Sequence, residues 1–309
     1  MKALLFYIVL LSCLLNGLPL PAQLQDLSYR LESGETYRLM IELQQETESE
    51  SMYSDQISLS SRASLLFMVD SITSDGIFHM TVSYRDLMLS LLAPGMGLEI
   101  SSESGRNPKL TAMADSLELK HFQLSMDRRG QLLYMEGLEE LFGSLSADRE
   151  EQPEEQVIRE TLSEAFGVNA VKSLLGLFVN IYPVLPSMTN WTNDVTYYFN
   201  TRPVGMINRY TLARQDSDRT IIQGLGMLQS DSAFIETTRM GRVSSLVSGS
   251  QTYDIQVDTR SGWPLECLSR QRLLVETTIL ESKSLPDGLK IPSYTETLFE
   301  VTGMKIELE

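Results

Sequence analysis

Long stretches of the chain alternate between apolar and polar residues. Residues 37–43 and 57–69 place mostly apolar side chains at every second position, with Arg, Glu and Ser among the residues between them. A second group of strand-like segments runs from residue 195 to residue 301. A period of two is typical of strands that have one face on a core and one in solvent, an arrangement common in antiparallel sheets. The pattern therefore predicts a mostly β protein.

The alternation changes phase once in the first half. Apolar residues occupy the even positions from 78 to 84 and the odd positions from 87 to 91. One extra residue near Arg85 and Asp86 would restore the register, so the pattern predicts a β-bulge there.

Two short helices and a tight hairpin are expected farther along this half. Asn107 and Pro108 suit the N-cap and first residue of one helix, and a second begins at Gly137. Between them, Asp127 and Gly130 suit the first and fourth positions of a type I turn.

The segment from residue 154 to residue 186 interrupts the β pattern. Its first half is acidic and amphipathic, and no charged residue occurs between Lys172 and Asp194. A helix that is apolar on all sides must be enclosed. The apolar run is shorter than the roughly 20 residues of a bilayer span, and Pro183 and Pro186 end it. We therefore predict a buried central helix and no transmembrane span in the mature chain.

These elements define the expected architecture. We predict an α+β fold, mainly β, in which two antiparallel β-rich halves wrap around the central helix. The expected segments are a signal peptide (1–22), an N-terminal β-rich half with two short helices (23–150), the central helix (154–186) and a C-terminal all-β half (187–309).

The N-terminus resembles an export signal. Lys2 precedes an apolar run, and the turn-forming residues that follow place cleavage after Ala22. The alternative is acylation at Cys13, as in a lipoprotein. Either route predicts a periplasmic, outer-membrane-associated or extracellular protein.

Charge and residue content exclude several functions. Removal of the signal leaves Cys267 as the only cysteine, so no intramolecular disulfide is expected. His79 and His121 fall on the polar face of their strands, and we identify no catalytic residue, no metal site and no cofactor. The net charge of −16 disfavours nucleic acid and anionic lipid. A hydrolase that uses two paired carboxylates remains an alternative, because the sequence has 41 acidic residues and does not single out any pair of them.

Methionine is the remaining enrichment, with 15 residues in the chain. Flexible thioethers suit an adaptable apolar pocket, and they equally fill irregular cores. If the helix and the sheet leave a cleft, the candidate ligand-binding residues are Leu174, Phe178, Tyr182 and Met188.

Four short motifs resemble a family of secreted bacterial proteins known as domain of unknown function 6263. They are residues 34–37, the hairpin from Asp127 to Leu138, the segment from Ile181 to Trp191, and Gly249 to Trp263. Members tend to carry Gly-Asp shortly before the tryptophan, where this chain has Thr189 and Asn190. The resemblance implies a location in or outside a Gram-negative envelope, and it supplies no catalytic residues.

Three functions are compatible with these observations. The first is a non-enzymatic envelope protein that binds an apolar small molecule or lipid. The second is a structural or interaction protein that binds another envelope protein through its acidic β-surface, and the third is an unrecognised hydrolase.

Overall fold

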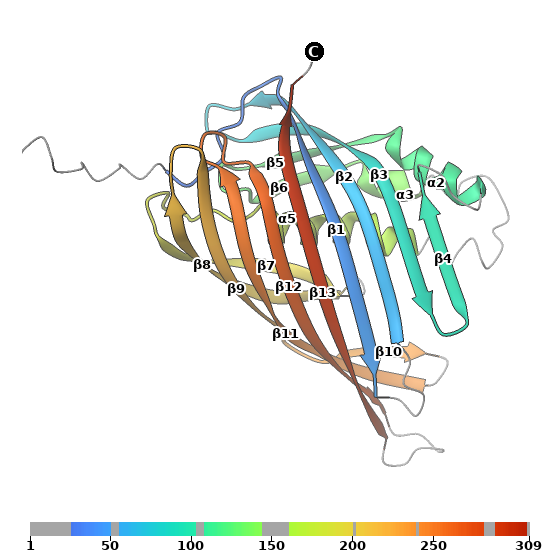
Figure 1. Ribbon diagram of the computed structural model, residues 1–309. Coiled ribbons are helices and arrows are strands. Elements are labelled where there is room, and N and C mark those ends of the chain that lie inside the picture. The colour runs from blue at the N-terminus through green and yellow to red at the C-terminus, as the bar shows by residue number, and fades with distance from the viewer. Residues whose placement is uncertain are drawn as a thin grey trace, which may run out of the picture.

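The computed structural model describes residues 26–50, 56–102, 108–143, 161–199, 202–238, 241–280 and 288–307. Within them, thirteen strands form one large, curved antiparallel sheet (Figure 1). The strands are β1 (Thr36–Ser49), β2 (Gln56–Ile72), β3 (Phe78–Ala93), β4 (Met96–Ser101), β5 (His121–Met126), β6 (Leu132–Glu136), β7 (Asn190–Phe199), β8 (Arg202–Gln215), β9 (Arg219–Gln229), β10 (Phe234–Thr238), β11 (Gly241–Asp258), β12 (Pro264–Ile279) and β13 (Leu289–Ile306). The helices are α2 (Pro108–Glu118), α3 (Leu138–Gly143) and α5 (Val168–Phe178). Residues 161–166 are also helical.

The sheet is open, with β6 at one edge and β7 at the other. Its order is β6-β5-β3-β2-β1-β13-β12-β11-β9-β8-β7, while β4 pairs with β3 and β10 pairs with β11. Because β1 pairs with β13 from Thr36↔Ile306 to Ser49↔Ser293, the first and last strands join both ends of the chain in one sheet. The mostly β, antiparallel prediction is confirmed. The arrangement as two β-rich halves, one on each side of a helix, is not confirmed.

The central helix is shorter than predicted. Gly167 has an extended ψ of −173° and separates the helical residues 161–166 from α5. After Phe178 the backbone N–H groups of Val179 and Asn180 both donate to the carbonyl of Leu175, and the chain continues without helix to residue 186. The expected helical residues 154–160 lie outside the described part of the chain. Among the described helices, none is long and apolar enough to cross a bilayer.

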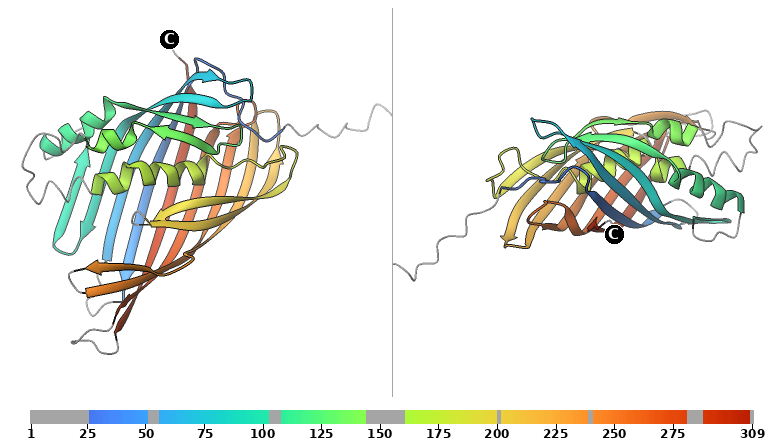
Figure 2. Two further views of the ribbon diagram at one scale, coloured as in Figure 1. Left: turned by 180° about the vertical axis from the view of Figure 1, so that it is seen from behind. Right: turned by 90° about the horizontal axis from the view of Figure 1, so that it is seen from above.

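Helix α5 lies across the concave face of the sheet (Figure 2) and contacts the edge strands β6 and β7. Its side chains Leu175, Leu177 and Phe178 are buried. The Phe178 ring lies 5.4 Å from that of Phe299 on β13. The predicted burial of Leu175 and Phe178 is confirmed, and the core lies between this helix and the sheet.

The predicted bulge is present in β3. Two steps along β2, from Arg62 to Ser64, oppose three steps along β3, from Met88 to Arg85. Asp86 takes a positive φ of 55° at this point. Its carboxylate accepts a hydrogen bond from Ser64 Oγ at 2.9 Å, and it pairs with Arg38 Nη2 at 2.5 Å. These contacts hold the bulge against β1 and β2.

An aromatic cluster and the N-terminal segment, residues 26–35, cover one end of the sheet. Tyr29 is fully buried, its ring lies 5.0 Å from that of Tyr182, and its hydroxyl donates to the carbonyl of Val179. Trp263 packs against Tyr29 and donates through its indole N–H to the carbonyl of Arg38. The segment therefore ties the end of α5 to β1 and to the start of β12.

The predicted turn at residues 127–130 is confirmed and provides a test of packing at this end. The N–H of Gly130 donates to the carbonyl of Asp127 at 3.0 Å, and Gly130 has a φ of +85°. A Cβ built on Gly130 would lie 2.0 Å from the carbonyl oxygen of Val179.

We expect Gly130→Ala to reduce the free energy of unfolding by about 2 kcal/mol, because a left-handed conformation is combined with a backbone clash. Gly95→Ala is the matched control, since Gly95 has a φ of +75° and open space around its Cβ position. The control should cost about 1 kcal/mol. Urea unfolding of both variants measures the difference, and equal midpoints would show that the turn can move away from Val179.

Candidate functional site

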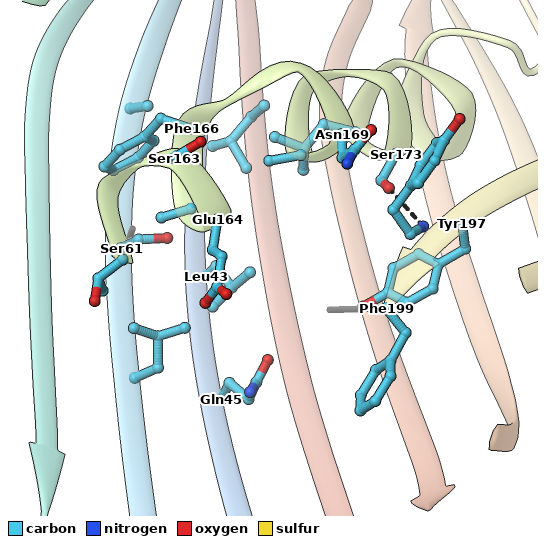
Figure 3. Close-up of a pocket in the computed structure, with 18 of the residues that line it drawn as sticks. Leu43, Gln45, Ser61, Ser163, Glu164, Phe166, Asn169, Ser173, Tyr197 and Phe199 are labelled. Atoms are coloured by element: carbon cyan, nitrogen blue, oxygen red, sulfur yellow. Dashed lines mark hydrogen bonds between the residues drawn. The ribbon is translucent and has the colours of Figure 1, made fainter. Parts of the chain in front are cut away.

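A cavity of about 550 Å³ lies on the concave face beside α5 (Figure 3). Its floor is formed by β1, β2, β3, β12 and β13, and its other walls come from α3, α5, the helical residues 161–166 and the end of β7. Pockets for small molecules usually measure about 300–1,000 Å³. The cavity is therefore large enough for a ligand.

Most of the cavity wall is apolar. The floor contributes Leu43, Leu59, Leu273 and Phe299, α5 contributes Leu174 and Leu177, and β7 contributes Tyr197 and Phe199. Figure 3 shows Tyr197 and Phe199 on the side opposite Glu164. An alkyl chain placed between these groups would leave water for apolar surroundings, which stabilises binding by about 0.8 kcal/mol per methylene.

A row of uncharged polar residues crosses the sheet at one level, from β8 to β1. Its members lie opposite one another on adjacent strands, and their side chains share the inward face: Asn208, Gln251, Gln271, Thr297 and Gln45, with Gly226 between the first two. Gln271 Nε2 donates to Gln251 Oε1 at 2.9 Å, and Thr297 Oγ1 donates to Gln45 Oε1 at 3.4 Å. We call this set the amide row. Gln45 is the member that also lines the cavity.

The amide row has spare hydrogen-bonding capacity. Gln271 Oε1 and Asn208 Nδ2 are buried and have no hydrogen-bond partner among the described residues. Leaving a buried polar group unpaired costs about 1–3 kcal/mol. The row is thus a line of polar side chains that runs from the cavity wall into the core.

Two carboxylates lie on the cavity wall. Glu139 comes from α3 and Glu164 from the helical residues 161–166, and both side chains are exposed. Figure 3 shows Glu164 pointing from its helix into the cavity. Among the described lining residues there is no Lys, Arg or His. Glu139 and Glu164 are therefore the charged side chains among the described residues of the wall.

The structure separates the four candidate residues of the sequence analysis. Leu174 lines the cavity. Phe178 is buried against Phe299, and Tyr182 is buried with its hydroxyl donating to the carbonyl of Gly262 at 2.6 Å. Burial raises the pKa of Tyr182. Met188 is 37% exposed on the turn after α5, so only Leu174 is brought to this cavity.

Most residues that line the cavity were not predicted from the sequence, although the pattern of β1 contains a signal for one of them. Gln45 follows Tyr37, Leu39, Ile41 and Leu43 at the inward positions of β1. A polar residue in the apolar phase of a strand is unusual and marks a place where the core is not purely hydrophobic.

The other candidate groups lie away from this cavity. His79 and His121 are both exposed, which confirms their predicted position on the polar face. The Nδ1 atom of His79 lies 2.8 Å from Ser125 Oγ. Cys267 is buried as predicted, and burial raises the pKa of its thiol. Within the described ranges, no three or more His, Cys, Asp or Glu residues are grouped as a metal site.

The sequence matches a known protein family. Residues 75–264 match the model of DUF6263, a family of unknown function. The chain belongs to this family. The match includes three of the four motifs that suggested it, while residues 34–37 lie outside. No curated protein matches the chain.

Solved structures show a similarity of fold. A structure described as lipid–protein interactions in lipovitellin superposes with a TM-score of 0.52 at 9% identity, covering 91% of this chain and 26% of that one. The chain thus spans about a quarter of the lipovitellin chain that it matches. Salmonella typhi OmpF in complex with daunomycin matches at a TM-score of 0.25 and 6% identity, covering 89% of this chain and 100% of that one, a score too low to support an argument.

Proposed function

We propose that this protein is a non-enzymatic binding protein that holds the alkyl chain of a lipid or a similar amphiphile on the concave face of its sheet. The observation that carries the proposal is the cavity between α5 and the sheet, with its mostly apolar wall. Concave, mostly apolar cavities with a few polar groups are the usual form of ligand sites.

The cavity communicates with solvent. Ser163 and Glu164 belong to its wall and are exposed. A ligand can therefore reach the cavity past these two exposed residues.

The similarity to lipovitellin supports the proposal at the level of fold. That structure is described by its interactions with lipid. Fold similarity is a weak guide to function, so the weight of the proposal rests on the cavity of this chain.

The test is the stoichiometry of binding. After organic extraction and refolding, the protein should bind an uncharged fluorescent probe with a long alkyl chain at one site and with a saturable signal. Native mass spectrometry of protein that has not been extracted should show a co-purified molecule. Non-saturable probe binding together with a ligand-free mass would contradict the proposal.

A second candidate function is an interaction protein of the cell envelope that uses the outer face of its acidic sheet. The observation that favours it is an exposed apolar group on adjacent strands. Ile207 on β8 lies opposite Met227 on β9, with exposed fractions of 51% and 57%, and Leu225 lies beside them. Cross-linking in cells would reveal a protein partner at this face.

We propose a periplasmic, outer-membrane-associated or extracellular location, which is compatible with both functions. We propose that the signal segment 1–22, which lies outside the described residues, is removed after Ala22. Intact mass of the protein recovered from the periplasm or the medium should match a chain beginning at Gln23. An acylated N-terminus at Cys13 would replace this proposal with a membrane-anchored form.

A further inference from the structure

The polar groups of the cavity restrict the chemistry of its ligand. Resting on the proposed function, we infer that the ligand is an uncharged amphiphile with a hydroxyl-bearing polar end on an alkyl chain, rather than a fatty acid or another anion. Glycerol and sugar head groups share this chemistry.

The carboxylates of the wall disfavour an anion. Glu139 and Glu164 line the cavity from two different helical segments. An anionic group in the cavity would share its wall with both carboxylates, and like charges repel even where solvent screens them. The net charge of the whole chain, −16, adds to this repulsion at long range.

The amide row favours hydroxyl groups. Gln45 presents an uncharged amide to the cavity, and Gln271 Oε1, farther along the row, is a buried acceptor without a partner. A hydroxyl group both donates and accepts hydrogen bonds, so it can join a row of amides directly or through water. A carboxylate only accepts, and an ammonium group would lose its hydration at this uncharged row.

Direct titration distinguishes these ligands. Three ligands with twelve-carbon chains are compared: monododecanoylglycerol, dodecyl glucoside and dodecanoic acid. Each is used below its micellar concentration at pH 8. Displacement of the uncharged fluorescent probe reports each affinity. We expect one or both hydroxyl-bearing ligands to bind about tenfold more tightly than dodecanoate at low salt, with a smaller difference at high salt. The better of the two identifies the glycerol or the sugar class.

Two variants assign the preference to named residues. Glu164→Gln should strengthen dodecanoate binding about two- to fivefold and leave the hydroxyl-bearing ligands unchanged, as expected for a partly exposed charge. Glu46→Gln is the matched control, because this substitution removes the same charge from an exposed position on the face of β1 that points away from the cavity. Gln45→Leu should weaken the hydroxyl-bearing ligand about five- to tenfold and affect dodecanoate less.

The outcomes separate this inference from the proposed function. If dodecanoate binds as tightly as the hydroxyl-bearing ligands, and Glu164→Gln changes nothing, the inference is wrong and the proposed function stands. If none of the ligands displaces the probe saturably, both are wrong. Because Glu164 is exposed, its variant tests the inference even if Gln45→Leu folds poorly.

Discussion

Replacing Phe178 by alanine is expected to reduce the free energy of unfolding by about 3 to 5 kcal/mol. The Phe178 side chain is 1% exposed and packs on Phe299 of β13, a central strand of the sheet. Its loss would leave a void where α5 meets the sheet, and the surrounding elements can relax only partly. A loss of this size is a large part of the stability of an ordinary domain.

Urea unfolding followed by circular dichroism measures the effect. Leu185→Ala is the control, because Leu185 lies on the turn after α5 with 62% of its surface exposed and should change stability by no more than about 0.5 kcal/mol. Equal unfolding midpoints for the two variants would show that α5 is not packed on the sheet as described.

Local features of the fold could be predicted from the sequence because they depend on neighbouring residues. The bulge at Asp86 follows from the phase of the apolar positions on its two sides. The turn ending at Gly130 follows from an Asp and a Gly at fixed spacing. In both cases the decisive residues lie within a few positions of each other, so the pattern alone contains the information.

Long-range pairing could not be predicted in the same way. Alternation gives the face of each strand but does not give its neighbour, and Thr36 pairs with Ile306 across almost the whole chain. The extent of the helix depended on Gly167, whose extended conformation separates α5 from the residues before it. The apolar pattern continues across that break and past the end of α5 at Phe178 to Tyr182, which explains the overlong prediction.

The candidate site was predicted only in part for a related reason. Leu174 was found because it belongs to the uncharged segment, but its cavity partners Leu43 and Phe299 come from strands more than a hundred residues away. Phe178 and Tyr182 share the apolar character of Leu174 and face the core instead. Composition along one helix therefore does not separate a packed face from a face that borders a cavity.

Leu174→Trp is expected to weaken binding of the uncharged alkyl probe about a hundredfold while leaving the fold intact. Leu174 is partly buried and lines the cavity from α5. An indole at this position would occupy the space of several methylenes of the ligand, each worth about 0.8 kcal/mol, and a loss of about 2.7 kcal/mol corresponds to a hundredfold.

The cavity makes this substitution tolerable for folding. Enlarging a side chain in a closely packed core costs about 1–3 kcal/mol, but about 550 Å³ of space adjoins Leu174 and can accept the indole. We therefore expect a stability change below about 1 kcal/mol, measured by urea unfolding beside the binding titration. Leu185→Trp introduces the same side chain on the exposed turn and should change neither quantity. Strong destabilisation of Leu174→Trp would show that the space is filled by packing, whereas unchanged binding would place the ligand elsewhere on the molecule.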